Sequence, residues 1–240
     1  ALETQSDSLI TLSYYTRGMV YYYKGYFKAS NEYYHRALQT TYAEQNPSFQ
    51  SKLLNNIGVN YDVLTEFDKA LNYYLRSLDI EKELENKPGV AQTNINIGLV
   101  YIWEKNFEQA FRYLEEARTY FEAHRDSFSL GLIYQNLMLH EYHTQEHFDP
   151  QPILSLAVKA EKCFEQIGNW NGLVEVYYNM SRVYQLEEDE TNVLAWLNKA
   201  LEVAREHELY SSETVLRIKL ARIKLMDTGK AEKEKVLLEG

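Results

Sequence analysis

The sequence is poor in the residues that form disulfides, tight turns and membrane spans. Cys163 is the only cysteine, so no disulfide can form within the chain and a zinc-cysteine cluster is excluded. With 10 glycines and 4 prolines, there are too few turn residues for a sheet protein, and an all-α fold is expected. No apolar run approaches the ~20 residues that cross a bilayer. We therefore expect no membrane insertion of this segment.

The chain also lacks an excess of positive charge. It carries 35 acidic against 25 basic side chains, a formal net charge of −10, and such a surface repels phosphate backbones, so nucleic acid is not an expected partner. The first residues, Ala1 to Ser8, are polar and unlike a signal peptide. Any targeting or transmembrane segment is expected outside this sequence, and both a periplasmic and a cytoplasmic location stay open.

Tyrosine, in contrast, is abundant, with 21 copies, and its positions recur with a period of 40 residues. In three copies a glycine precedes a tyrosine by three residues: Gly18 and Tyr21, Gly58 and Tyr61, Gly98 and Tyr101. Other positions recur in the same register: Phe27, Phe67 and Phe107; Ser30, Ala70 and Ala110; Tyr33, Tyr73 and Tyr113. A period of this length indicates a stack of repeated supersecondary units.

Two later copies of the repeat are altered. Met138 and Ser181 occupy the glycine position, and their separation of 43 residues indicates a three-residue insertion, which we place around Asp149 to Pro152. Because the Met138 side chain is larger than the residues it replaces, we expect the helices 127–146 and 151–167 to be spaced more widely than the helices 48–64 and 67–86.

Each copy is predicted to form two helices. Asn46-Pro47 and Asp149-Pro150 are expected to start helices by side-chain capping, and Gly25 is expected to end one in the left-handed conformation. The predicted helices are 9–24, 27–45, 48–64, 67–86, 89–104, 107–124, 127–146, 151–167, 170–187, 190–207 and 211–226, with a short one near 231–238.

These motifs resemble the tetratricopeptide repeat. The resemblance rests on Asn56-Ile57-Gly58 with Tyr61, on Glu66 to Leu71, and on Tyr73-Tyr74 with Ser77-Leu78, and it extends over nearly the whole chain. It implies an all-α, right-handed superhelical solenoid of antiparallel helix pairs, forming a single domain over 1–240. The expected repeats are 11–50, 51–90, 91–130, 131–173 and 174–213, with a partial repeat at 214–240.

The 40-residue unit is longer than the usual unit of about 34 residues. The stretch Leu84 to Ala91 is similar to long-repeat arrays in sensor kinases and regulators of Bacteroidetes-like bacteria. Peptide-pheromone receptors of Gram-positive bacteria and animal polarity adaptors with 40-residue units are also similar.

The resemblance implies a binding groove lined by one face of the first helix of each copy. The positions three residues before, one after and four after the glycine share that face. They are Tyr15, Met19 and Tyr22; Asn55, Val59 and Asp62; Ile95, Leu99 and Ile102; Gln135, Leu139 and Tyr142; and Tyr178, Arg182 and Gln185.

This mixture of aromatic, aliphatic and amide side chains suits a peptide or an apolar helix as partner. The alternative is that Ile95, Leu99 and Ile102 only pack on neighbouring repeats. A carboxylate clamp of the chaperone-binding type is not supported, because Tyr15 and Met19 occupy its lysine and asparagine positions.

The two sets of tyrosines are expected to differ in burial. Tyr21, Tyr61, Tyr101 and Tyr184 are expected in the core. The groove tyrosines lie about 100° away around the helix and are expected to be partly exposed on the concave side. They are Tyr15, Tyr22, Tyr142 and Tyr178.

Catalytic chemistry is weakly represented. His140, His143 and His147 have spacings that allow a metal site on one side of a helix, but we favour the interpretation that they belong to a polar, solvated helix end. No nucleophile elbow, phosphate loop or dinucleotide motif is present. We expect a non-catalytic module that binds a protein or peptide without a cofactor or metal, in the sensing or scaffolding part of a bacterial signalling protein. A stand-alone cytoplasmic receptor or scaffold and a metal-dependent enzyme are the alternatives, and the oligomeric state stays open.

Overall fold

The computed structural model describes residues 2–213, 215–217, 219 and 220, and the predicted helix at 231–238 lies outside these. Within them the chain is helical and contains no strand. The helices are α1 (Leu2–Tyr23), α2 (Phe27–Leu38), α3 (Thr41–Glu44), α4 (Pro47–Val63), α5 (Phe67–Glu83), α6 (Lys87–Trp103), α7 (Phe107–His124), α8 (Ser127–Thr144), α9 (Pro150–Gln166), α10 (Trp170–Leu186) and α11 (Glu190–Glu206).

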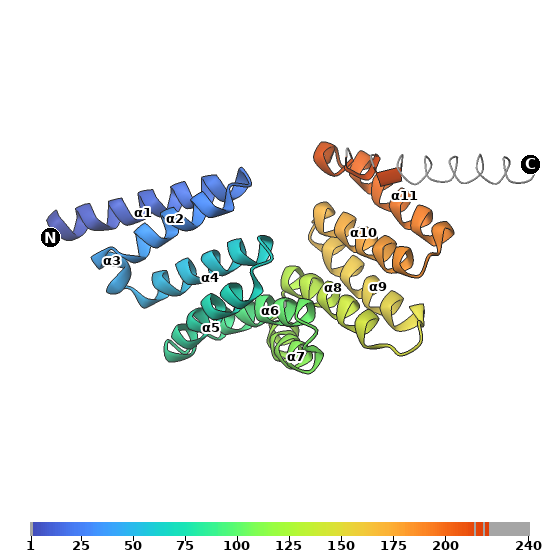
Figure 1. The fold of residues 1–240 in the computed structure, drawn as a ribbon, viewed down its shortest axis with the longest axis horizontal. Helices are drawn as coiled ribbons and strands as arrows, with labels where there is room; N and C mark the ends of the chain where they lie inside the picture. The colour runs from blue at the N-terminus through green and yellow to red at the C-terminus, as the bar shows by residue number, and fades with distance from the viewer. Residues whose placement is uncertain (1, 214, 218, 221–240) are drawn as a thin grey trace, which may run out of the picture. The chain divides into compact units, whose positions relative to one another are not determined.

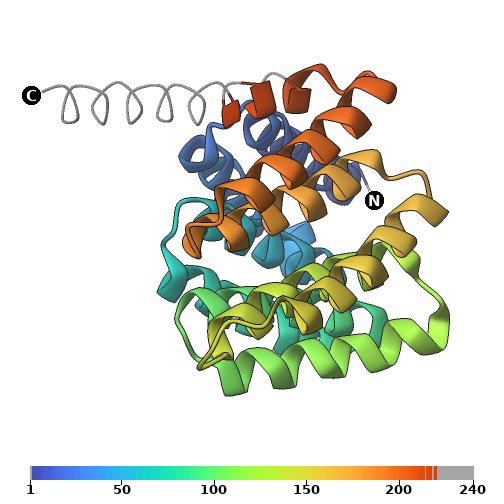
Figure 2. The ribbon, with the colours of Figure 1, turned by 90° about the vertical axis from the view of Figure 1, so that its right-hand side faces the viewer.

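The helices pack as five consecutive antiparallel hairpins, which confirms the predicted all-α fold of tetratricopeptide type (Figure 1). The chain divides into two compact units with the boundary between Arg125 and Asp126. The first unit contains the hairpins α1–α2, α4–α5 and α6–α7. The second contains α8–α9 and α10–α11, which pack against each other (Figure 2). The expectation of one continuous solenoid over 1–240 stays a prediction.

The hairpin turns reproduce the repeat in their backbone angles. Gly25 has the predicted left-handed conformation, with φ of 78°, and Thr65 and Lys105 adopt it at the same place in the next two hairpins, with φ of 58° and 60°. A left-handed residue lets the chain reverse within three residues after a helix. The turns are therefore part of the 40-residue period, although only the first uses glycine.

The fourth hairpin departs from this pattern where the insertion was predicted. Five residues connect α8 to α9, whereas three connect α4 to α5. The Asp149 carboxylate caps α9 by accepting a hydrogen bond from the Gln151 amide at 2.9 Å, as expected. Asn46, by contrast, makes no side-chain cap at α4, so this part of the capping prediction was wrong.

Two helix boundaries near the N-terminus differ from the prediction. The helix expected at 27–45 is interrupted at Thr40, whose extended backbone and side chain cap the short helix α3. α1 begins at Leu2 rather than residue 9, and its Asp7 carboxylate accepts a hydrogen bond from the Tyr42 amide at 2.5 Å. This contact joins the start of α1 to α3 and explains why the helix extends further than its apolar pattern.

The glycine of each early repeat allows the two helices of a hairpin to approach closely. A Cβ atom at Gly58 would lie 2.6 Å from the Tyr74 ring, and one at Gly98 would lie 2.7 Å from the Leu114 side chain. Tyr74 and Leu114 are almost fully buried. The glycine therefore makes room for a large residue that lies sixteen positions later in the chain.

The fourth hairpin reverses this arrangement of sizes. Met138 is fully buried, and the register of α9 places Ala157, also buried, where Tyr74 stands in α5. A large residue on the first helix and a small one on the second can fill the same space as the glycine–tyrosine pair. The wider spacing expected at this hairpin stays a prediction.

Candidate functional site

The first two repeats form a hollow of about 230 Å³ in the first unit. Four of the predicted groove residues line it: Tyr15, Met19, Tyr22 and Val59. Tyr23, Tyr34 and Asn56 complete the lining. The stripe on α1 and the stripe on α4 therefore converge on one concavity, as helices of successive repeats do when they stack.

Aromatic packing shapes this hollow. The Tyr15 ring lies edge-on to Phe49, with centroids 5.4 Å apart, and tilted against Tyr34 at 6.0 Å. Tyr34 is 3% exposed, and burial raises the pKa of its hydroxyl to about 12. The Lys52 ammonium lies 4.8 Å from the Tyr15 centroid. The hollow is thus held by rings that are themselves fixed, which limits the entropy lost when a ligand enters.

Asp62 supplies a negative charge beside the hollow. It lies one helical turn after Val59 on α4, and its charge contributes to the raised pKa of Tyr22, for which burial is the larger cause. Within the described part of the chain, the Asp62 side chain makes no ion pair or hydrogen bond. Its burial without compensation raises the pKa of the carboxyl to about 6. A carboxylate in this state attracts a cation.

The remaining groove residues of the first unit have structural roles. Ile95 and Ile102 are 3% and 1% exposed, so in this structure they pack as core residues. Leu99 is half-buried. The Asn55 amide oxygen accepts a hydrogen bond from the Asn96 amide at 3.0 Å, which links α4 to α6. The alternative stated for these residues, that they pack as core residues, therefore holds for the two isoleucines in this structure.

In the second unit the predicted residues do not line one shared hollow. Gln135 is buried and donates a hydrogen bond to the Gly172 carbonyl at 3.3 Å. The Tyr142 hydroxyl donates to the Glu187 carboxylate at 3.1 Å, and Leu139 is half-buried. Arg182 and Gln185 are exposed.

Tyr178 contributes to a separate hollow of about 310 Å³ in the second unit. Residues of α10 line one side of it, and the other side is lined by Ser211, Ser212, Val215, Leu216 and Lys219. The Lys219 ammonium contacts the Tyr178 hydroxyl and lies 4.0 Å from its ring centroid. The Tyr178 ring is therefore already in contact with a cation from its own chain.

The repeated tyrosines are less buried than predicted. Tyr21, Tyr61 and Tyr101 are half-buried, as the four groove tyrosines are, so the expected contrast between the two sets was wrong. Each stacks on a tyrosine of the second helix, with centroids 5.2 to 5.7 Å apart: Tyr33, Tyr73 and Tyr113. Stacking covers one face of the ring and leaves its edge open. Tyr184, in contrast, is buried as expected.

The sequence reasoning missed several tyrosines that do fill the core, among them Tyr34 and Tyr74. Both lie sixteen residues after a glycine of the repeat. This interval, together with the small residue it starts from, is the signal that could have found them.

The histidines of α8 do not form a metal site. α8 ends at Thr144, so His147 lies outside the helix that carries His140 and His143. Across the described residues, no group of three or more His, Cys, Asp or Glu side chains is arranged to hold a metal ion. Among the same residues, no helix is both long and apolar enough to cross a membrane.

Comparison with protein families identifies the repeat. Tetratricopeptide-repeat family models match residues 49–123 and 174–207. Response regulator aspartate phosphatase I of Bacillus subtilis (strain 168) is 33% identical over 114 residues, which are 45% of this chain and 28% of that protein. The chain thus spans less than a third of this relative's length.

Solved structures show the same fold. A Rap protein complexed with competence and sporulation factor superposes with a TM-score of 0.76 at 18% identity, covering 87% of this chain and 58% of that one. The Rap conjugation gene regulator of plasmid pLS20, in complex with the Phr* peptide, has a TM-score of 0.70 at 18% identity and covers 85% and 56%.

BtubC from P. vanneervenii has a TM-score of 0.63 at 19% identity and covers 87% of this chain and 92% of that one. The 40-residue period, the five helix pairs and these matches all indicate the same fold. The chain is an array of tetratricopeptide repeats.

Proposed function

We propose that the chain is a non-catalytic binding module that recognises a peptide or a peptide-like segment of a protein through the hollow of its first two repeats. The observation that carries the proposal is the uncompensated carboxylate of Asp62 beside a hollow lined by Tyr15, Met19 and Tyr22. An aliphatic or aromatic side chain fits the lining, and a neighbouring lysine, arginine or free amino terminus would neutralise Asp62.

The comparisons support a regulatory setting. The matched relative is named a response regulator aspartate phosphatase, and two of the similar solved structures are complexes, one with competence and sporulation factor and one with the Phr* peptide. We propose that this chain is likewise the sensing or scaffolding part of a bacterial signalling or regulatory protein. The hollow itself holds tyrosines, a methionine and a valine, which favours binding over catalysis.

A peptide-display selection tests this function. The wild-type chain, immobilised, should select peptides enriched in lysine or arginine beside an apolar residue. The Asp62→Asn variant should lose the enrichment in basic residues. Tyr22→Ala should weaken the binding of the selected peptides by about five- to thirtyfold, as for a contact of about 1–2 kcal/mol.

The control is Lys199→Ala, on the exposed face of the second unit, where the ammonium pairs with Glu161 at 3.2 Å. This variant should select the same peptides as the wild type. Selection of one peptide set by all four proteins, or of peptides without basic residues by the wild type, would contradict the proposal.

A further inference from the structure

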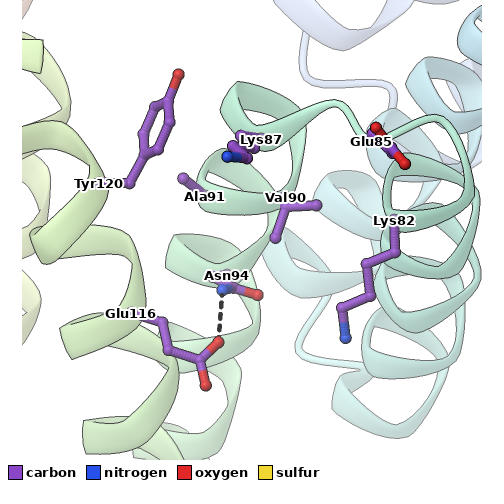
Figure 3. Close-up of a pocket in the computed structure, with 8 residues that line it drawn as sticks. All are labelled: Lys82, Glu85, Lys87, Val90, Ala91, Asn94, Glu116 and Tyr120. Atoms are coloured by element: carbon purple, nitrogen blue, oxygen red, sulfur yellow. Dashed lines mark hydrogen bonds between the residues drawn. The ribbon is translucent and has the colours of Figure 1, made fainter.

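A second hollow in the first unit, of about 380 Å³, shares no lining residue with the one around Tyr22. It is bounded by the end of α5, the first half of α6 and the second half of α7 (Figure 3). Val90, Ala91 and Tyr120 supply apolar surface. Two lysines and two glutamates surround them, so the charges of the lining balance: Lys82, Lys87, Glu85 and Glu116. Such a lining favours an occupant without net charge.

One polar group of this hollow has no partner. Asn94 is 2% exposed, and its Nδ2 atom donates a hydrogen bond to the Glu116 carboxylate at 3.2 Å. Its Oδ1 atom accepts no hydrogen bond from any described residue and is itself buried, so a ligand reaches it only when a covering side chain moves. A buried acceptor left unsatisfied costs about 1–3 kcal/mol, and native proteins rarely tolerate it without a reason.

The orientation of this amide follows from its neighbour. A carboxylate only accepts hydrogen bonds, so the nitrogen of Asn94 must face Glu116 and the oxygen must face the other way. In Figure 3 the oxygen points away from Glu116, toward the side where Val90 and Lys82 lie. The Lys82 side chain is exposed and makes no ion pair within the described part of the chain, so it can move aside at little cost.

From this arrangement we propose that the hollow binds a flat, uncharged and mainly apolar group that carries one N–H donor, as the indole ring does. The N–H would satisfy Asn94 Oδ1, and the ring would lie against Val90, Ala91 and Tyr120. Free indole-type molecules and the tryptophan side chain of a protein partner share this chemistry. The inference does not depend on the site around Tyr22.

The test compares two probes of nearly equal shape. Indole and benzothiophene differ in that only indole has an N–H group. Titrated against the full chain and followed by protein amide shifts in NMR spectra, indole should bind at least tenfold more tightly and should shift the amides of Val90, Ala91 and Tyr120. N-acetyl-tryptophan amide, titrated in parallel, should bind more tightly than indole if the natural occupant is a tryptophan side chain, and more weakly if it is a free molecule.

Two variants locate the interaction. Asn94→Leu, similar in size but without the acceptor, should remove the preference for indole while keeping benzothiophene binding. Ala91→Met should fill the hollow and abolish binding of both probes. A thermal melt of each variant shows whether it folds. If Asn94→Leu does not fold, Ala91→Met still tests the proposal. Equal affinity for both probes, shifts elsewhere on the chain, or no binding of either probe, which would mean that only water occupies the hollow, would each overturn the proposal.

Discussion

At the scale of single residues, the environment of a side chain decides its role more than its type does. Tyr22 and Tyr74 are chemically identical, yet Tyr22 borders an accessible hollow while Tyr74 is 1% exposed beneath Gly58. Asp62 illustrates the same point. It is an ordinary aspartate in sequence, and burial away from any cation raises its pKa. Charge and aromatic content alone do not distinguish these cases.

The raised pKa of Asp62 predicts how stability depends on pH. Between the ordinary value of 3.8 and about 6, the folded chain holds a proton that the unfolded chain releases. Raising the pH through this window should therefore lower the free energy of unfolding attributable to Asp62. A shift of about 2 pH units sets an upper limit of about 3 kcal/mol, which solvent screening of a half-buried group reduces.

Urea unfolding of the wild type and of Asp62→Asn at pH 4, 5 and 7 measures this effect. The variant should be the more stable protein at pH 7, and the difference should vanish near pH 4. A difference that does not change with pH would show that Asp62 is fully solvated. Peptides that bind through a basic group should lose affinity as the pH falls below about 6, because protonation removes the charge they recognise.

At the scale of helices, each hairpin solves the same packing problem with a different pair of residues. Gly58 faces Tyr74 and Gly98 faces Leu114, whereas in the fourth hairpin the equivalent positions hold Met138 and Ala157, both buried. The summed volume of the two side chains matters more than the volume of either one, because two helices at a given separation leave a given volume between them.

An exchange between hairpins tests this account. Tyr74→Ala alone should cost about 3–5 kcal/mol by leaving a cavity. Gly58→Met alone should also destabilise the protein, by about 1–3 kcal/mol or more, because the methionine side chain would overlap with the Tyr74 ring. The double variant reproduces the arrangement of the fourth hairpin. Its loss in free energy of unfolding should be smaller than the sum of the two single losses by about 0.5–3 kcal/mol. Chemical unfolding of the four proteins completes the cycle, and additive losses would show that the two positions do not share a space.

At the scale of the whole molecule, the chain consists of two compact units, and both hollows described in α1–α7 belong to the first. This unit holds three hairpins, and a tetratricopeptide array needs at least about three repeats to be stable, a number that the first unit reaches. Arg125, in the left-handed conformation with φ of 55°, ends α7 at the boundary.

A fragment of residues 1–125 should therefore fold by itself. We expect a helical circular dichroism spectrum, one cooperative thermal transition and retention of the peptides selected by the full chain. A fragment that is helical but binds none of them would mean that the second unit contributes to the binding site. A fragment that does not fold would mean that the first unit depends on contacts beyond residue 125.

The repeat, its period, the helix pairs and the place of the insertion at the fourth hairpin could all be predicted from the sequence. These follow from local rules, because the apolar spacing of a helix and the conformation of a turn depend on neighbouring residues. The stripe positions also include four residues that line one hollow in the structure, Tyr15, Met19, Tyr22 and Val59, and the binding role of this hollow stays a proposal.

Which members of each stripe are accessible depends on the packing of distant helices and could not be predicted from the sequence. Ile95 and Tyr15 hold equivalent positions of the repeat, yet Ile95 is buried by packing around α6 while Tyr15 borders a hollow. The unpartnered oxygen of Asn94 and the uncompensated charge of Asp62 likewise depend on what neighbouring helices place beside them. Burial and pairing are sums over residues distant in the chain, and a period of 40 residues carries no record of them.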